Sequence, residues 1–328
     1  MMKAVVLETF GGPEALTIKE IPEPVPGPEE IRIRVAASAL NRADLLERQG
    51  LYPPPGKKPA FQVPGLEVSG WVDAVGDQVT LFRPGDPVMA LLSGGGYAEY
   101  ALSHERLAMS IPSGVPVAEG AAIPEVFLTA FDALFSRGGG RPGDRVLVHA
   151  GASGVGSAAI QLARQSGFRV AATVGSQRKL EAAYAFGADR VINYRTEKFQ
   201  EAVREWSGGD GADVILDFIG QQYLEDNLLS LAPEGTLVLI GTMSGTTAPI
   251  NLGLVLGRRL KIHGTALRSR PVEQKMALVQ AFLHQVSGWF SSGAVKPVID
   301  RAYSLAEIAE AHRYMESNQN IGKILVQV

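Results

Sequence analysis

The stretch that decides the fold is Val146-Leu-Val-His-Ala-Gly-Ala-Ser-Gly-Val-Gly156. An apolar run from Val146 to Ala150 leads into a turn with three glycines, and a helix-forming run from Ser157 to Gln165 follows. Glycines permit a tight turn and close approach of the backbone to a pyrophosphate, and the free N–H groups and dipole of a helix start attract negative charge. The order of strand, glycine turn and helix therefore predicts a dinucleotide-binding turn.

The sequence around this turn alternates between short apolar runs and helical segments, which predicts βαβ units and a parallel sheet. The strands that we expect there are 145–150, 169–174, 190–193, 214–219, 236–241 and 260–264. The first third of the chain instead contains short strands separated by turns. Ile31, Ile33 and Val35 alternate with arginines, the period of a half-buried strand. Near the end, Ser304 and Glu307 fit a capping box before a helix, and a last strand is expected at 323–328.

Length and composition favour a globular protein with two domains. The chain has 328 residues, of which 46% are hydrophobic and 20% charged, and its net charge is -3. Such a charge favours neither nucleic-acid nor membrane binding. Residues 146–163 carry no formal charge, but their glycines and polar side chains argue against a membrane span. The start of the chain lacks the pattern of a signal peptide, so we expect a cytoplasmic protein.

The end of the second strand indicates which nicotinamide cofactor is used. A ribose-binding Asp or Glu is expected about 20 residues after the glycine turn in NAD-dependent proteins. Here the segment reads Val174-Gly-Ser-Gln-Arg-Lys179, without a carboxylate. Ser176, Arg178 and Lys179 could instead bind the 2'-phosphate of NADPH. The alternative is that Arg178 and Lys179 are solvated charges on a helix surface.

With these features the chain resembles the medium-chain dehydrogenases/reductases, and among them the zinc-free quinone oxidoreductases related to zeta-crystallin. The segments that carry the resemblance are 37–44, 48–52, 64–67, 94–97, 122–125, 149–156, 175–179 and 320–323. The resemblance implies an α/β fold, in which a doubly wound Rossmann sheet is inserted into a GroES-like, mostly β substrate domain. It implies a GroES-like domain of residues 1–123 and 267–328, an NADPH-binding Rossmann domain of residues 124–266, and a cofactor cleft between them.

The resemblance also implies roles for single residues. The cofactor would be bound by the following residues: Asn41, Thr129, Gly154, Val155, Gly175, Ser176, Lys179, Tyr194, Gly241, Leu267 and Asn320. Tyr52 and Ser153 match positions with a proposed catalytic role in this family, and Asn41 is a further candidate donor to a developing oxyanion. For Tyr52 the alternative is packing within a proline-rich loop. For Ser153 it is the need of a tight turn for a small residue.

Zinc is not expected in this chain. Zinc-dependent members of the superfamily carry cysteines and a Gly-His-Glu run, whereas this chain has Gly65-Leu66-Glu67 and no cysteine. Glu67 alone cannot supply the three protein ligands of a catalytic zinc. His104, His284 and His312 are expected on surfaces or helix faces, His149 on the first Rossmann strand and His263 on the last.

We therefore expect an NADPH-dependent reductase of small quinones, ortho-quinones among them. Hydride transfer to such an electron-poor acceptor requires mainly that the protein positions the cofactor and the quinone. One alternative is an NADPH-dependent reductase of enone or alkenal double bonds. Another, from a different class, is an NADPH-binding structural or RNA-binding protein like some crystallins. The resemblance also implies a homodimer or a dimer of dimers, with residues 260–264 as the paired sheet edge.

Overall fold

The computed structural model describes residues 1–56 and 59–328, which fall into two units. Unit 1 consists of Met1–Leu128 and Leu267–Val328, and unit 2 consists of Thr129–Ala266. Helix α2, Pro124–Phe131, contains the last residues of the first segment of unit 1 and the first residues of unit 2. Both chain ends thus contribute to unit 1, while unit 2 is one continuous segment.

Unit 2 is built on a parallel sheet. Within residues 129–266 its strand order is β10-β9-β8-β11-β12-β13, the order of a doubly wound dinucleotide-binding fold. The strands are β8 Arg145–Val148, β9 Arg169–Val174, β10 Arg190–Asn193, β11 Ala212–Asp217, β12 Leu231–Leu239 and β13 Lys261–Gly264. The apolar side chains of β8, β9 and β11 are buried, as expected for parallel strands covered on both faces.

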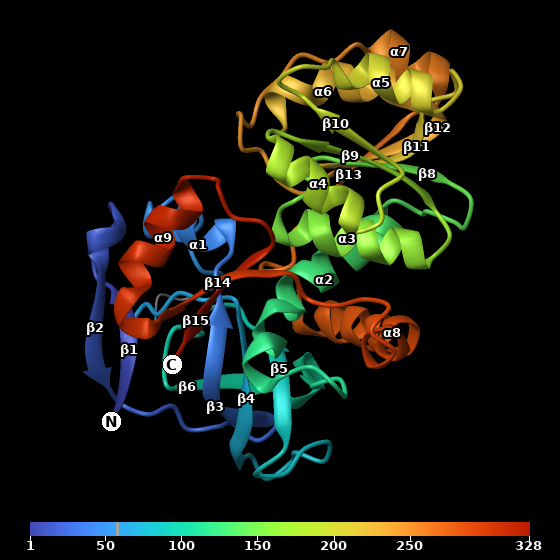
Figure 1. Cartoon of the computed structure of the whole chain (residues 1–328). Coiled ribbons are helices and arrows are strands. Elements are labelled where there is room, and N and C mark those ends of the chain that lie inside the picture. Colours follow the sequence, from blue (N-terminus) through green and yellow to red (C-terminus); the bar gives the residue numbers. More distant parts are fainter. Residues whose placement is uncertain (57–58) are drawn as a thin grey trace. The chain divides into compact units, whose positions relative to one another are not determined.

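Helices cover both faces of this sheet, with α3 and α4 on one side and α5, α6 and α7 on the other (Figure 1). Their bounds are α3 Gly154–Gln165, α4 Gln177–Ala185, α5 Phe199–Trp206, α6 Leu224–Ser230 and α7 Leu252–Arg258, with a π-helical turn at Asp132–Arg137 and a 3-10 turn at Gln221–Tyr223. The predicted strands 169–174 and 190–193 are confirmed at both ends. The strand predicted at 236–241 is longer at its start, because Leu231 already pairs with Ala212 across an irregular register.

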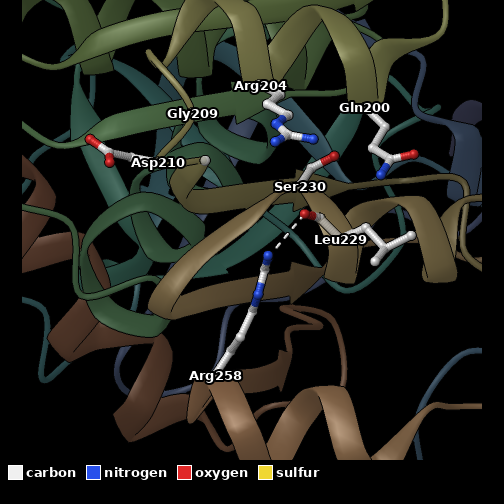
Figure 2. A pocket seen from close by; sticks show the side chains of 8 residues that line it. Gln200, Arg204, Gly209, Asp210, Leu229, Ser230 and Arg258 are labelled. Atoms are coloured by element: carbon white, nitrogen blue, oxygen red, sulfur yellow. Dashed lines mark hydrogen bonds between the residues drawn. The ribbon is translucent and has the colours of Figure 1, made fainter.

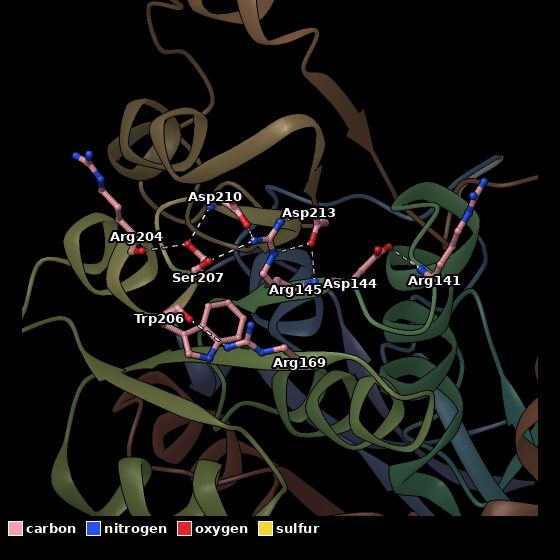
Figure 3. A network of polar contacts seen from close by, with 10 residues as sticks. Arg141, Asp144, Arg145, Arg169, Arg204, Trp206, Ser207, Asp210 and Asp213 are labelled. Carbon is pink, nitrogen blue, oxygen red and sulfur yellow. Dashed lines mark hydrogen bonds and ion pairs between the residues drawn. The ribbon is translucent and has the colours of Figure 1, made fainter.

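A network of charged and polar groups joins the amino ends of strands β8, β9 and β11 in unit 2 (Figure 3). The guanidinium of Arg145 lies 2.7 Å from the Asp210 carboxylate and 3.0 Å from that of Asp213. Arg169 stacks on the Trp206 ring at 5.2 Å and donates to its carbonyl oxygen. These contacts fix the end of the sheet that lies away from the glycine turn.

Unit 1 contains a mixed sheet with the order β14-β15-β3-β4-β5-β7, on which β6 pairs with β3, and a hairpin of β1 and β2. The strands are β1 Met2–Leu7, β2 Leu16–Ile21, β3 Glu30–Ala39, β4 Glu67–Val75, β5 Pro87–Leu91, β6 Tyr100–His104, β7 Ala108–Ser110, β14 Ile299–Ser304 and β15 Lys323–Gln327. Ile31, Ile33 and Val35 are buried, which confirms the predicted alternation. Strand β15, from the end of the chain, pairs antiparallel with β3.

The helices of unit 1 come from both chain segments (Figure 1). They are α1 Arg42–Arg48, α8 Val272–Ser291 and α9 Ile308–Glu316, with 3-10 turns at Pro13–Ala15, Glu105–Leu107, Val117–Ala122 and Leu305–Glu307. The predicted capping box is present, since the Ser304 N–H donates to the Glu307 carboxylate at 2.9 Å. Among the described residues, no helix combines the length and apolar character that a membrane span requires.

Candidate functional site

The glycine turn of unit 2 has the geometry of an anion-binding site. Strand β8 ends at Val148, and α3 begins at Gly154 with Ser153 as its N-cap. The Ser153 hydroxyl oxygen accepts a hydrogen bond from the Gly156 N–H at 3.0 Å. Gly154 and Val155 occupy the first helical positions, whose N–H groups have no acceptor within the helix and point away from its start.

Two glycines in this turn cannot be replaced without a clash. A Cβ at Gly156 would approach the Gly151 backbone to 2.8 Å, and a Cβ at Gly151 would lie 2.8 Å from that of Ala172. Helix α3 and strand β9 therefore approach the turn so closely that no side chain fits at Gly151 or Gly156. This close packing, together with the first-turn N–H groups, fits a pyrophosphate at the turn.

The segment after β9 provides the second part of the predicted cofactor site. Ser176 is the N-cap of α4, and its hydroxyl oxygen accepts from the Lys179 N–H at 3.4 Å. Gly175 leaves space for the Tyr194 ring, which a Cβ there would hit. Tyr194 itself is 46% exposed, so a ligand could stack on it. The structure thus brings Gly175, Ser176, Lys179 and Tyr194 together at one edge of unit 2.

Four predicted residues lie outside these groups. Thr129 is buried in α2, and Gly241 is partly exposed and follows β12. Leu267 is a buried residue and is the first residue of the second segment of unit 1. Asn320 is also buried, and its side-chain amide donates to the Gly322 carbonyl oxygen at 2.9 Å.

The core of unit 1 holds a buried ion pair beside Asn41. The Lys323 ammonium lies 2.7 Å from the Glu67 carboxylate, and both side chains are less than 5% exposed. It also donates to the carbonyl oxygen of Leu40 at 2.6 Å and to the amide oxygen of Asn41 at 2.7 Å. The charge of Glu67 is therefore paired with that of Lys323. Among the described residues, no group of three or more His, Asp or Glu could hold a metal ion.

The side chain of Asn41 is engaged on both ends. Its amide nitrogen donates to Glu67 at 2.9 Å and to the carbonyl oxygen of Ala39 at 3.2 Å, while its oxygen accepts from Lys323. Both amide hydrogens are therefore used within the protein. This geometry holds Asn41 rigidly but provides no spare side-chain donor for an oxyanion.

Glu125 lies next to this ion pair at the start of α2. Its backbone N–H donates to the second oxygen of the Glu67 carboxylate at 2.8 Å. Burial and the negative charge of Glu67 raise the pKa of the Glu125 side chain to about 8. The Glu125 carboxyl is therefore mostly protonated at neutral pH. A perturbed carboxyl of this kind is typical of functional sites.

Tyr52 lies in the loop between α1 and β4, outside regular secondary structure, and is partly buried. Its hydroxyl has no hydrogen-bonding partner among the residues that the structure describes. Burial, and secondly the charge of Glu125, raise the pKa of the phenol above its usual value. The hydroxyl therefore stays protonated and can act as a donor.

Two of the histidines are buried structural residues. His149 directly follows β8, and its nitrogens lie 2.9 Å from the Thr173 hydroxyl and 2.7 Å from the Asn227 amide oxygen. Burial lowers its pKa to about 4, so it is neutral. His312 lies on α9, but on the buried face rather than at the surface, and burial lowers its pKa to about 3. Neither is suited to relay protons at neutral pH.

Unit 2 also contains a polar cavity of about 270 Å³ near Arg204, Ser230 and Arg258 (Figure 2). Arg258 donates to the Leu229 carbonyl oxygen at 3.1 Å. The cavity lies where β11 and β12 begin, since Gly211 and Ser230 each precede one of these strands. Ligands of doubly wound sheets bind at the carboxyl ends of the strands, so this cavity is not the cofactor site.

Sequence reasoning missed Glu125, Arg268 and Asp217 as candidate site residues. Asp217 ends β11, and its carboxylate accepts from the N–H groups of Ile219 and Gly220 at 2.7 and 3.1 Å. Burial raises its pKa to about 6. The strand predicted at 214–219 placed Asp217 inside the sheet, whereas the observed strand β11 ends at Asp217, so the predicted bounds hid its position at the carboxyl end. Arg268 lies with its guanidinium over the Tyr52 ring, and it gave no local signal because 216 positions separate the two residues in the sequence.

Comparisons with known proteins match both parts of the chain. Residues 27–113 match the family model for the alcohol dehydrogenase GroES-like domain, and residues 154–282 match the one described as zinc-binding dehydrogenase. A quinone oxidoreductase of Pseudomonas aeruginosa is 33% identical over 99% of this chain and 99% of its own length. The rat quinone oxidoreductase is 32% identical over 99% of this chain and 98% of its own.

Solved structures agree with these matches over the full length. The structure of a mycobacterial protein complexed with NADPH superposes with a TM-score of 0.88 at 31% identity, covering 100% of both chains. Fold, glycine turn and sequence similarity thus point to the same kind of protein.

Proposed function

Since this chain belongs to the quinone oxidoreductase family of the medium-chain dehydrogenases/reductases, we propose that it reduces small quinones, ortho-quinones among them, with NADPH and without zinc. The single observation that carries this proposal is the match to quinone oxidoreductases along nearly the entire chain. It is supported by Leu66, a buried residue without metal-binding atoms in the Gly-Leu-Glu run.

As a member of this family the chain uses a nicotinamide cofactor, and we assign NADPH. The support lies in the segment after β9, where a ribose-binding carboxylate is missing and Ser176, Arg178 and Lys179 follow. We further propose that Gly154 and Val155 bind the pyrophosphate, and that Gly175, Lys179 and Tyr194 bind the adenosine 2'-phosphate end. Thr129, Asn41, Gly241, Leu267 and Asn320 would complete the site. NADPH, when bound, supplies the hydride.

The protein's own contribution to the reaction is to orient the quinone and stabilise the oxyanion that develops on it. We assign the main hydrogen-bond donor to Tyr52, whose hydroxyl is unengaged among the described residues. Ser153 is a second candidate, because its oxygen accepts from Gly156 while its O–H remains a donor. Asn41, with both amide hydrogens engaged, forms a rigid wall of the site. A proton from solvent or from an acidic group completes the quinol.

Steady-state oxidation of NADPH tests this proposal. The unmodified protein should reduce an ortho-quinone such as phenanthrenequinone faster than a panel of enones, and Tyr52→Phe should lower kcat with little change in the KM for NADPH. Faster turnover with enones would favour the double-bond reductase. Binding of NADPH without turnover of either class would favour a structural or sensing protein.

We also propose a homodimer or a dimer of dimers that pairs through β13. This strand forms the edge of the unit 2 sheet, and its residues are mostly exposed. Leu252 and Leu256 of α7, the helix that precedes β13 in the chain, are 70% and 80% exposed, which gives unit 2 two apolar side chains available for an interface. Sedimentation equilibrium would test this, and a monomer at micromolar concentration would contradict it.

A further inference from the structure

Arg268 contacts Tyr52 in two different ways. Its guanidinium lies over the Tyr52 ring at 5.2 Å from the ring centre, and its Nη1 donates to the Tyr52 backbone carbonyl oxygen at 3.0 Å. Side chain and backbone of the same tyrosine are thus held by one group. Both residues belong to unit 1, although 216 positions separate them in the sequence.

Arg268 is itself rigidly fixed. Its Nη2 lies 2.6 Å from the Glu47 carboxylate, and these side chains are 4% and 1% exposed. Its Nε donates to the carbonyl oxygen of Ser93 at 2.9 Å. The Lys275 ammonium donates to the Arg268 carbonyl oxygen and to the Ser93 hydroxyl, both at 2.9 Å. The guanidinium therefore has little freedom to leave Tyr52.

Tyr52, in contrast, has little local support. It lies outside helices and strands and is followed by Pro53, Pro54 and Pro55, which lack N–H donors. The position of its hydroxyl, which has no hydrogen-bonding partner among the described residues, is then determined by the ring and the backbone. Both are in contact with Arg268.

We propose that Arg268 is the positioning residue for Tyr52, holding its hydroxyl where it donates to the developing oxyanion. This inference rests on the proposed function of Tyr52 as the donor. The planar guanidinium is required, because it stacks on the Tyr52 ring while its Nη1 and Nε donate to the carbonyl oxygens of Tyr52 and Ser93 and its charge pairs with Glu47. A lysine ammonium is a compact point charge and cannot make these contacts together.

Kinetics of single and double variants test the proposal. Arg268→Lys and Arg268→Met should lower kcat with phenanthrenequinone by roughly ten- to a hundredfold, the loss typical of a misplaced catalytic group, and leave the KM for NADPH nearly unchanged. In the Tyr52→Phe background the same changes should have almost no further effect on kcat. Arg34→Met is the matched control, because Arg34 stacks on Trp71 at 5.0 Å elsewhere in unit 1. Its kcat should equal that of the unmodified protein.

Removal of the arginine leaves Glu47 buried without its partner, so Arg268→Met could fail to fold. The double variant Glu47→Gln/Arg268→Met removes this charge and should fold, with the same loss of kcat. Thermal unfolding of each variant checks this. Arg268→Lys retains a cation near Glu47 and provides a second folded variant.

NMR of ring-labelled tyrosine gives a readout that does not depend on turnover. The Tyr52 resonance, identified by its loss in Tyr52→Phe, should shift and broaden in Arg268→Lys and in Glu47→Gln/Arg268→Met, but not in Arg34→Met. An unchanged resonance would overturn the proposal even if the protein reduced no quinone. Equal losses of kcat from the Arg268 changes with and without Tyr52→Phe would also overturn it. If Tyr52→Phe alone left kcat unchanged while the resonance moved, Arg268 would still position Tyr52, and the proposed donor role would be the part that fails.

Discussion

Replacing Lys323 with methionine should destabilise unit 1 far more than the loss of an ordinary ion pair. The Lys323 ammonium has three oxygen partners within 2.7 Å, from Leu40, Asn41 and Glu67, and is almost completely buried. Methionine fills a similar volume but leaves the Glu67 carboxylate buried without its cation. Breaking a buried pair in this way costs about 3 to 5 kcal/mol. In a domain of this size, that corresponds to a loss in Tm of roughly 6 to 20 °C.

Urea unfolding followed by tryptophan fluorescence measures this effect. Trp71 and Trp289 lie in unit 1 and Trp206 in unit 2, so a Trp206→Phe background reports on unit 1. Lys19→Met is the matched control, because Lys19 pairs with Glu8 at the surface, where the two side chains are 39% and 60% exposed. That exposed pair should contribute at most about 1 kcal/mol.

A double variant isolates the physical cause. Lys323→Met combined with Glu67→Gln removes the unpaired charge, and the amide oxygen can still accept from the Glu125 N–H. The double variant should therefore be more stable than Lys323→Met alone. The reasoning is refuted if Lys323→Met costs no more than Lys19→Met, or if the second change recovers no stability.

Three further predictions concern the cofactor, pH and metal. Lys179→Ala should raise the KM for NADPH by roughly ten- to a hundredfold, since a charge-assisted hydrogen bond is worth about 1.5 to 3 kcal/mol. The KM for NADH should stay almost unchanged, because NADH lacks the 2'-phosphate. Equal effects on the two KM values would contradict the proposed phosphate site. The folded-state pKa of Glu125 is raised from 4.5 to about 8, so between these two values the folded protein keeps a proton that the unfolded chain has lost, and stability should fall as pH rises from about 5 to 8 and level off above 8. Glu125→Gln should flatten this fall in urea titrations at pH 6 to 9, and an unchanged slope would show that Glu125 ionises normally. Finally, quinone reduction should persist in a strong chelator, and elemental analysis that finds one tightly bound zinc per chain would disprove the zinc-free assignment.

The sequence predicts the parallel sheet of unit 2 well, because its central strands β8, β9 and β11 are short runs of buried apolar side chains. Strands β9 and β10 begin and end at the predicted residues. Helix α3 begins at Gly154, whereas the helical run was expected from Ser157. Glycine is a poor helix former, so Gly154 and Gly156 gave no helical signal in the sequence. The glycine turn and the capping of α3 and α4 follow from local chemistry, and local chemistry can be seen in a sequence.

The polar core of unit 1 could not be predicted in the same way. Lys323 and Asn41 are 282 positions apart, and no periodicity or spacing connects them. The sequence also did not show that the Asn41 side-chain amide has no free donor. Its nitrogen donates to the Glu67 carboxylate and to the Ala39 carbonyl oxygen. His312 lies on the predicted helix face, but the sequence did not show that this face is completely buried.

The charges in the core of unit 1 balance only when the two chain segments of this unit are folded together. The buried carboxylates Glu67 and Glu47 come from the first segment, and the cations that pair with them, Lys323 and Arg268, come from the second. An unpaired charge in a protein interior is expensive, so neither segment can bury its half of the cluster alone. Asn41 and Tyr52, the candidate site residues of the first segment, are contacted by these same two cations. The second segment of unit 1 therefore supplies the cations that contact Asn41 and Tyr52, two candidate site residues of the first segment.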